Sequence, residues 1–494
     1  MTSLDSSLHR TPPEPDAVPV RHRPGLVVVA AAVTALAGAG CVHYQPRPIS
    51  ASDTATTLAA RSFADPGLSA FLAENDEPVP ARGSAWNLRA LTLAAFYFQP
   101  ALDVARAEVA AAQAGTVSAG ARQNPALGAS AGFNSSTPVH SISPWILDFN
   151  LDIPFTTAGK RRHQIAEATK LAEVARFKLA AVAWSVRSQV RSAALELYAA
   201  LGRQALLVKQ VGILQANAEL LDARLAAGEI SAFEATQGHL ALTTARMARA
   251  EAGARVEAAR GQLAQALGVP AVALTEIRVG FDEFQKPTAE IPSAQARRAA
   301  LLNRADILAS LAEYDASEQA LALEVARQYP EVHLGPGYEF DQGDSKWLLG
   351  VALPIPVMNR NRGPIAEAEA RREAIGAQFV AVQAAAMAEI DQAVAGCEAA
   401  QRTLSVSEAI DADLGRQEQA ASARFEAGEI SRLELGSIHL EAVDAEMSRL
   451  DAEVRAQVAL GRLEDAMQTS SQAVAAMVGH APRERDQRPG EPRR

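Results

Sequence analysis

The residues best able to do chemistry in this sequence are nine histidines and two cysteines, which are scattered along its length. The histidines do not stand at the spacings of zinc ligands, and Cys41 and Cys397 are too few to build a disulfide framework. The sequence has no glycine-rich phosphate loop and no Gly-x-Ser-x-Gly motif. It therefore predicts no catalytic residues, no metal site and no cofactor, and we do not expect an enzyme.

Two of the histidines, His239 and His439, recur at equivalent places in a repeated segment. Each follows a predicted helix start by eight residues, where a polar contact between helices explains a histidine better than a zinc ligand does. Met247 and Met447 recur in the same way and are expected to pack between helices. Cys397 is expected to be a small buried apolar residue.

The repeated segment occurs at an offset of 200 residues and matches over about thirty positions without a gap. Its two copies begin Ala223-Arg224-Leu225-Ala226-Ala227-Gly228-Glu229-Ile230-Ser231 and Ala423-Arg424-Phe425-Glu426-Ala427-Gly428-Glu429-Ile430-Ser431. Chance is a poor explanation for a match of this length, so the sequence indicates an internally duplicated protein.

Each copy carries the signals of a tight turn between two helices. Glycine takes the left-handed conformation that ends a helix, and serine with a carboxylate three residues later forms a capping box. The sequence therefore predicts two helical hairpins with tips at residues 228–231 and 428–431. The residues that carry these signals are Gly228, Ser231 and Glu234 in the first copy and Gly428, Ser431 and Glu434 in the second.

The composition favours long helices over a thick globular core. The chain has 494 residues and is 48% hydrophobic but only 5% aromatic, and alanine is abundant. The net charge of −10 argues against nucleic acid as a partner, because phosphate binding needs a basic face. We expect a mixed, mainly α class.

The N-terminus has the pattern of an exported protein. Basic residues precede an apolar run at 25–36, which is too short to span a bilayer as a retained helix, so we expect a signal peptide at 1–40. Ala39-Gly40-Cys41 resembles a lipobox, although Gly38 stands where that motif usually has leucine. We expect an acylated Cys41 followed by an extended tether at 41–84 with at most short helices; an ordinary signal peptide with an incidental cysteine is the alternative.

Two segments switch from a helical period to an alternating one. We expect β-hairpins at 126–154 and 331–357, in which Trp145, Leu147 and Phe149 share an apolar face and Asp148 and Asn150 share a polar one. A soluble hairpin packed on a helix is the alternative, but two matching hairpins behind an export leader favour a transmembrane barrel. Four strands cannot close a barrel, so other copies of the chain must complete it.

Helices are expected to fill most of the remaining chain. One helix is predicted from Trp86 to Arg122, and another from 160 to 227 would be ~100 Å long. We place the first repeat at 85–292, with an excursion at 268–292, the second at 293–469, and a disordered tail at 470–494. The end of the long helix shows the a/d seam of a coiled coil: Leu207, Val211, Leu214, Ala218, Leu221 and Leu225.

Between Trp86 and Met467 these features resemble the TolC family of outer-membrane efflux channels. The resemblance implies a homotrimer in the cell outer membrane, with twelve strands in one β-barrel, an α-barrel in the periplasm, and an adaptor protein and an inner-membrane RND-type pump as partners. It also implies contact with outer-membrane lipid. Segments at 299–306, 328–330, 334–338 and 359–370 resemble the heavy-metal branch of the family, which suggests divalent metal ions as the exported solute.

The resemblance also assigns roles to residues at the tips. It implies adaptor contacts at Gly228, Ile230, Ser231, Gly428, Ile430 and Ser431. It places Glu434 where the family often has an acidic ring at the constriction of the tunnel, although helix capping alone explains Glu434 about equally well. A structural periplasmic lipoprotein that acts as a spacer and has no transport role is the alternative function.

Overall fold

The computed structural model describes residues 44–81, 83–136, 143–285 and 292–468. The chain divides into two compact units, residues 1–56 and 57–494. Helix α2 (Ala51–Ala59) crosses that boundary, and all other described elements belong to the second unit. The expected signal peptide at 1–40, Cys41, the tail at 470–494 and part of the excursion at 268–292 lie outside the described residues.

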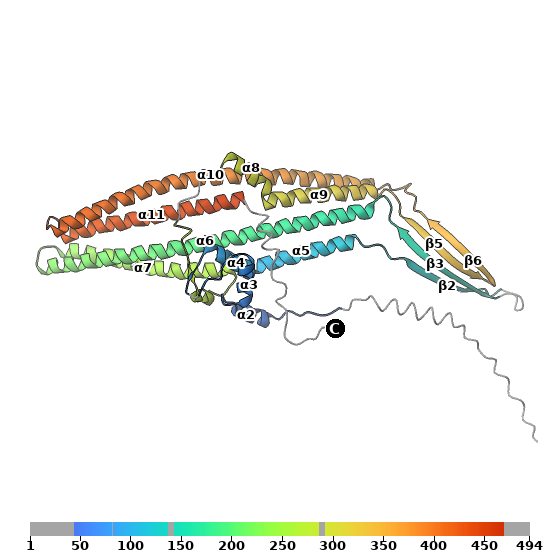
Figure 1. The fold of residues 1–494 in the computed structure, drawn as a ribbon, viewed down its shortest axis with the longest axis horizontal. Coiled ribbons are helices and arrows are strands. Elements are labelled where there is room, and N and C mark those ends of the chain that lie inside the picture. Colours follow the sequence, from blue (N-terminus) through green and yellow to red (C-terminus); the bar gives the residue numbers. More distant parts are fainter. Residues whose placement is uncertain (1–43, 82, 137–142, 286–291, 469–494) are drawn as a thin grey trace, which may run out of the picture. The chain divides into compact units, whose positions relative to one another are not determined.

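Two long helical hairpins make up most of the second unit. The first consists of α6 (Lys160–Ala226) and α7 (Ala232–Leu267), and the second of α10 (Arg362–Glu426) and α11 (Arg432–Met467). Helix α6 packs against both α7 and α11, and α11 packs against α10. The helices therefore lie side by side in the order α7, α6, α11, α10 (Figure 1).

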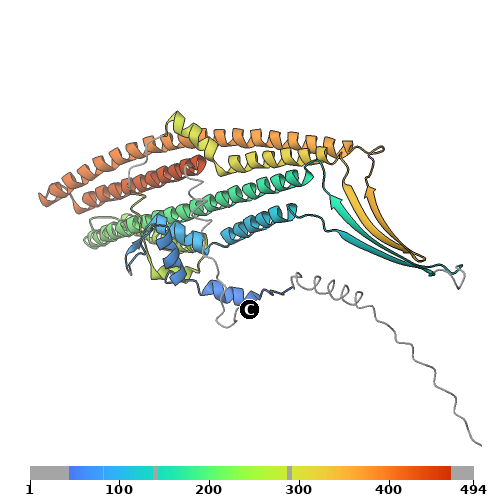
Figure 2. The ribbon, with the colours of Figure 1, turned by 45° about the vertical axis from the view of Figure 1, so that its right-hand side comes forward.

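Nearer the strands the same layer continues with different members. Helices α5 (Pro100–Ala119) and α9 (Ala305–Ala326) pack on α6, and α9 also packs on α10. The order here is α5, α6, α9, α10, as the turned view in Figure 2 also shows. The layer is thus four helices wide on both sides of its middle, and α6 and α10 run through both halves.

The long helix α6 follows from its sequence. It has 67 residues and no proline, so no missing amide interrupts its hydrogen bonds over ~100 Å. Part of the expected coiled-coil seam is buried: Leu207 is 7% exposed, Val211 6% and Ala218 2%. Val211 and Ala218 form a cluster with the α7 residues Leu242 and Ala245.

The four strands form one antiparallel sheet in the order β2 (Ala126–Phe133), β3 (Trp145–Phe155), β5 (Val332–Asp341) and β6 (Asp344–Ala352). Its register places large apolar residues opposite one another on one face: Phe133 lies opposite Trp145, Phe149 opposite Tyr338, and Tyr338 opposite Trp347. One face is therefore apolar on every strand. Among the described residues, the outer edges of β2 and β6 have no strand partner.

The main aromatic core lies beside the helical layer, around α3 (Pro66–Glu74) and α4 (Leu88–Phe98). A short parallel pair of strands, β1 (Ala85–Trp86) and β4 (Arg278–Val279), joins this region to the excursion after α7, which also contains the 3₁₀ helix η1 (Ala271–Glu276). Helix α8 (Ala294–Asn303) precedes α9. Phe71 and Leu68 are 1% and 0% exposed, so this part of the expected extended tether packs as core instead.

One expectation about the helices was wrong. The single helix predicted from Trp86 to Arg122 is two helices, α4 and α5, because Pro100 interrupts it. Gln99 takes an extended conformation with ψ 117°, as the residue before a proline prefers, and Pro100 starts α5 where no amide is needed. The mixed, mainly α class is confirmed.

Candidate functional site

The turn between α6 and α7 is held by backbone hydrogen bonds of the Schellman type. The Gly228 amide donates to the Leu225 carbonyl at 3.0 Å, and the Glu229 amide donates to the Arg224 carbonyl at 2.9 Å. This pattern needs a left-handed residue after the helix end, and Gly228 has φ +76°. Glycine takes that conformation without a Cβ clash, so the sequence dictates where the helix ends.

The turn between α10 and α11 has the same geometry. The Gly428 amide donates to the Phe425 carbonyl at 2.9 Å, the Glu429 amide donates to the Arg424 carbonyl at 2.9 Å, and Gly428 has φ +75°. No heavy atom outside the immediate chain lies within 4 Å of a Cβ placed on either glycine. Both turns are therefore open to solvent and shaped by the backbone.

A serine starts the returning helix at both tips. The Ser231 hydroxyl accepts from the Glu234 amide at 3.3 Å, and the Ser431 hydroxyl accepts from the Glu434 amide at 3.2 Å. Among the hydrogen bonds of the described residues, neither glutamate carboxylate returns a bond to the serine amide, so only half of each expected capping box is present. The Glu434 carboxylate is exposed, which leaves it available for a role other than capping.

Each tip also contains an ion pair that the sequence reasoning missed. Arg224 lies 3.0 Å from Glu229, and Arg424 lies 3.3 Å from Glu429. The signal was present as an arginine and a glutamate five residues apart, repeated in both copies. Such exposed pairs contribute little stability, but they fix the orientation of two charges on each tip.

The two tips differ in how they pack. Ile430 is 7% exposed, whereas Ile230 is only half-buried. His239 Nε2 lies 2.8 Å from an Asp222 carboxylate oxygen, and His439 Nε2 lies 3.7 Å from Glu418. Both histidines therefore make contacts between the two helices of their hairpin, as expected.

The two hairpins are held together by buried polar groups between α6 and α11. Arg191 is 7% exposed and donates to the Gln457 carbonyl at 2.7 Å. Burial lowers the pKa of the Arg191 guanidinium, and burial also raises the pKa of Asp465, against the effects of its hydrogen bond from Ser188 and the charge of Arg187. These groups fix the register of the two hairpins relative to each other.

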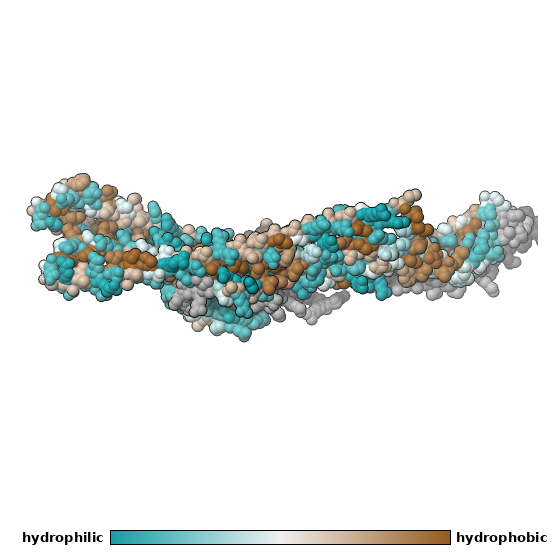
Figure 3. Space-filling model, turned by 90° about the horizontal axis from the view of Figure 1, so that it is seen from above, coloured by the Kyte–Doolittle hydropathy of each residue, from teal (hydrophilic) through white to brown (hydrophobic). Residues whose placement is uncertain are grey.

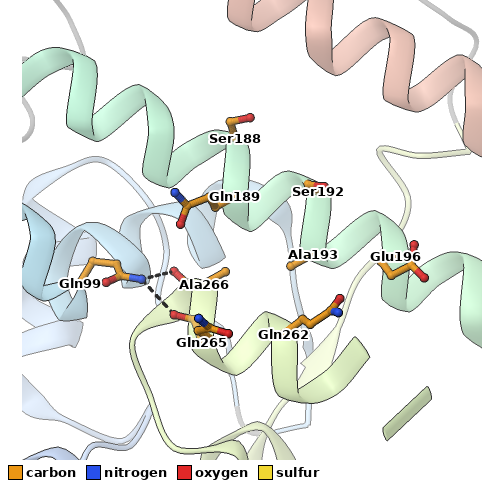
Figure 4. Close-up of a pocket in the computed structure, with 9 residues that line it drawn as sticks. All are labelled: Gln99, Ser188, Gln189, Ser192, Ala193, Glu196, Gln262, Gln265 and Ala266. Carbon is orange, nitrogen blue, oxygen red and sulfur yellow. Dashed lines mark hydrogen bonds between the residues drawn. The ribbon is translucent and has the colours of Figure 1, made fainter. Parts of the chain in front are cut away.

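A polar groove of about 890 Å³ lies where α7 ends beside α6 (Figure 4). The Gln99 side chain donates to the Gln265 and Ala266 carbonyls at 3.0 and 2.9 Å, so it satisfies the last carbonyls of α7. The groove is lined by neutral amides and hydroxyls with one carboxylate, which gives no acid and base pair for catalysis. The lining residues are Gln99, Ser188, Gln189, Ser192, Ala193, Glu196, Gln262, Gln265 and Ala266.

The apolar face of the sheet is uncovered. Trp347 is 85% exposed, Leu349 73%, Leu127 68% and Phe133 60%. Figure 3 shows the same feature as a hydrophobic region over the strands. A face of this size without a cover in water marks an interaction surface.

Within the described ranges, no three His, Cys, Asp or Glu side chains are grouped so that they could hold a metal ion. None of the described helices is both long enough and apolar enough to cross a membrane.

The sequence pattern of the outer membrane efflux protein family matches residues 98–269 and 296–479, which together are more than half of the chain. A cobalt-zinc-cadmium resistance protein from Cupriavidus metallidurans, CzcC, is 26% identical over 330 residues, covering 65% of this chain and 74% of the relative.

Solved structures with the same fold include two outer-membrane proteins. VceC from Vibrio cholerae is 22% identical with a TM-score of 0.62, covering 77% of this chain and 95% of that one. The CmeC outer-membrane channel from Campylobacter jejuni is 15% identical with a TM-score of 0.63, covering 90% of this chain and 98% of that one.

These matches confirm the resemblance drawn from the sequence. Because members of the family are outer-membrane efflux channels, the expectation that the chain is not an enzyme is confirmed by the family itself. The chain belongs to the outer membrane efflux protein family.

Proposed function

We propose that this protein is the outer-membrane channel of a tripartite efflux system, a homotrimer that conducts solutes passively from an inner-membrane RND-type pump and a periplasmic adaptor to the outside. The observation that carries this proposal is the exposed apolar face of the sheet, which belongs in lipid. The helical hairpins attached to the sheet supply the periplasmic part of the conduit.

The proposed trimer follows from the free edges of the sheet. The strands β2 and β6 run antiparallel to each other, so β6 of one copy can pair with β2 of the next and continue the alternation. A closed barrel removes the unpaired backbone groups that lipid does not tolerate. Three copies give the twelve strands implied by the family.

The edges of the helical layer support the same assembly. On α7, Phe233, Leu240 and Met247 are 70%, 58% and 58% exposed and stand seven residues apart. On α10, Val406 and Ile410 are 60% and 50% exposed. Apolar residues at heptad spacing are typical of a coiled-coil seam, so we propose that α7 of one copy packs on α10 of its neighbour.

Reconstitution of the purified protein into a planar bilayer tests the channel. Discrete conductance steps, together with the mass of a trimer in detergent by light scattering, are the expected results. A stable detergent-solubilised monomer would contradict the proposed assembly. An absence of conductance from an intact trimer would favour the structural spacer instead.

We also propose that Cys41 is the acylated N-terminus of the mature chain, so that the protein is anchored by lipid in the inner leaflet of the outer membrane. Its support is the lipobox-like sequence Ala39-Gly40-Cys41. Mass spectrometry of the native N-terminus tests it. Cleavage elsewhere with an unmodified Cys41 would contradict the anchor and leave the barrel unaffected.

The tips are the proposed contacts for the adaptor. Their support is the turn that both copies share, in which no heavy atom beyond the chain neighbours lies within 4 Å of a Cβ placed on Gly228 or Gly428. The proposed contact residues are Gly228, Ile230, Ser231, Gly428, Ile430 and Ser431. Replacement of both glycines by valine should abolish efflux in a complemented deletion strain, and unchanged efflux would remove these contacts.

The proposed cargo is divalent metal ions. The support is the similarity to a cobalt-zinc-cadmium resistance protein. The described residues themselves contain no cluster that could hold a metal ion, so they give no independent support. A deletion strain should lose tolerance to zinc, cobalt or cadmium. Unchanged metal tolerance with raised drug sensitivity would reassign the cargo to organic solutes.

Glu434 is proposed to line the constriction of the tunnel, where three copies of its carboxylate would attract cations and repel one another. The support is that its side chain is exposed and makes no return bond to Ser431 among the described contacts. Its counterpart Glu234 has the same local geometry, so a variant at Glu234 is the control for a variant at Glu434.

A further inference from the structure

The four passages between strand and helix lie at one end of the sheet. The register pairs Ala126 with Asp152, Phe155 with Val332, and His333 with Ala352. The first residues of β2 and β5 therefore stand beside the last residues of β3 and β6. A molecule that borders the apolar face at this end of the sheet therefore lies next to all four strand–helix junctions.

This end carries exposed positive charge. Arginines lie just before β2, after β3 and after β6, and no ion pair of these arginines occurs among the pairs of the described residues: Arg122, Arg162, Arg360 and Arg362. Three carboxylates near this end already have partners. Glu331 pairs with Lys160 at 3.6 Å, Glu324 accepts from Asn361 at 2.9 Å, and Asp152 lies 3.0 Å from His333. The first turns of α6 and α10 contain no acidic residue.

Exposed apolar residues lie directly beside these arginines. In the connection from β6 to α10, Ile355 is 74% exposed, Val357 71% and Met358 97%. They continue the apolar face of β6, where Val351 is 64% exposed. A run of uncovered apolar side chains followed by two arginines, Arg360 and Arg362, is amphipathic along the chain.

The opposite end of the sheet has a different charge. The ends of β5 and β6 that flank their connecting turn carry Glu339, Asp341 and Asp344, with Lys346 bound to Asp341 at 2.6 Å. The described part of the sheet is therefore bordered by unpaired arginines at one end and by an excess of carboxylates at the other.

We propose that the helix-side end of the sheet binds the headgroups of a phospholipid leaflet. The four arginines, which we call the basic collar, contact lipid phosphates, while Ile355, Val357 and Met358 lie at the boundary with the acyl chains. Arginine matches phosphate with a planar fork of donors, and its stem covers apolar surface. The inference rests on the proposed membrane barrel and adds the residues through which the barrel contacts the phosphates of that leaflet.

The test uses the full-length protein in dodecyl maltoside micelles that contain a small fraction of dioleoylphosphatidylglycerol. The quantity measured is the apparent dissociation constant for this lipid, from its retention on the immobilised protein. Dioleoylglycerol, which has the same acyl chains without phosphate, is the comparison lipid. The variant Arg360→Gln with Arg362→Gln should weaken phosphatidylglycerol retention by about fivefold for each arginine and leave dioleoylglycerol retention unchanged.

The matched control is Arg402→Gln with Arg416→Gln, which removes the same charge from α10 far along the helix, where both arginines are exposed. This control should retain the lipid as wild type does. Equal retention in all three proteins, or equal loss in both variants, would overturn the basic collar.

Two further measurements separate the outcomes. Loss of the trimer in lipid-free detergent on Arg360→Gln with Arg362→Gln would show that the collar contacts a neighbouring copy, and would overturn the lipid assignment. Bilayer conductance of the wild type tests the channel independently. A conducting trimer without phosphate-dependent retention rejects only the collar, whereas a wild type without trimer or conductance rejects the proposed function.

Discussion

Helices α6 and α10 occupy equivalent places in the two repeats, yet one is central and the other peripheral. They have 67 and 65 residues, but 19 residues of α6 are buried and only six of α10. The reason is position in the layer: among the described elements, α6 packs against α5 and α7 as well as α9 and α11, whereas α10 packs mainly against α9 and α11. The long helix of the duplicated hairpin therefore lies inside the helical layer in the first repeat and at the edge of the layer in the second.

The two hairpins are more alike in the hydrogen bonds of their turns than in the packing around those turns. Both tips keep the same hydrogen bonds and the same glycine φ, because the turn is fixed by residues within the turn. The packing around the turns differs, because Ile430 is buried whereas the equivalent Ile230 is only half-buried. The open edge at α10 is where the proposed trimer would place a neighbouring copy of the chain.

The largest expected effect tests the central helix against the edge helix. Leu195 on α6 is 2% exposed, so Leu195→Ala should lower the free energy of unfolding by about 2–5 kcal/mol through a cavity. Ile410→Ala on α10 should change subunit stability by less than about 0.5 kcal/mol but reduce the trimer fraction. Urea unfolding at several chain concentrations measures subunit stability, and light scattering measures the trimer fraction. Equal losses of subunit stability would break the comparison.

The tips should respond alike to the loss of glycine. Because Gly228 and Gly428 have φ +76° and +75°, valine at either should cost about 1–2 kcal/mol of unfolding free energy. Gly212→Val is the control, since Gly212 lies within α6 with nothing near its Cβ position. Denaturant midpoints measure the effect. A cost at one tip only would mean that the two turns are not equivalent.

The contact between the hairpins should show an acid dependence. Burial raises the folded-state pKa of Asp465 above its unfolded value of about 3.9, so the native state binds the proton more tightly. Wild-type stability should therefore fall as pH rises from about 4 through the raised pKa. Asp465→Asn, which still accepts from Ser188, should remove this fall.

Urea midpoints between pH 4 and 7 measure the dependence, with Asp451→Asn as the control because Asp451 is half-exposed beside Arg203. The two curves for wild type and Asp465→Asn running parallel over the whole range would contradict the role of Asp465.

The smallest expected effect on stability distinguishes the two glutamates at the tips. Glu234→Gln and Glu434→Gln should each change the unfolding free energy by less than about 0.5 kcal/mol, because only the backbone amides bind the capping serines. Cation selectivity in bilayers should change for Glu434→Gln alone. An equal change for both variants would mean that the two tips face the tunnel in the same way.

The features predicted from the sequence are those with local causes. Gly228, Ser231 and their copies fix the turns within a few residues, and the alternation around Trp145 fixes a strand with one apolar face. The family resemblance, drawn from such segments, is confirmed by the family match.

The sequence did not lead us to one feature that has a local signal, or to several features that depend on distant packing. The break between α4 and α5 had a local signal in Pro100, which periodicity over the segment concealed. Arg191 reads as a surface residue until α11 lies beside it, and nothing near Phe71 indicates that α4 will cover it. The different burial of α6 and α10 has no local signal, because it depends on the order of helices in the layer.

The joint at Gln99 has a mechanical consequence. Gln99 clamps the last carbonyls of α7, and Arg61 donates to the Phe98 and Gly268 carbonyls at 2.7 and 2.6 Å. These side chains thereby link the end of α7 to the start of α5, although the two helix ends are not consecutive in the sequence. A pull on a tip is transmitted through α6 by covalent bonds but across this joint only by hydrogen bonds and apolar packing. Under load, this side of the layer should therefore yield first.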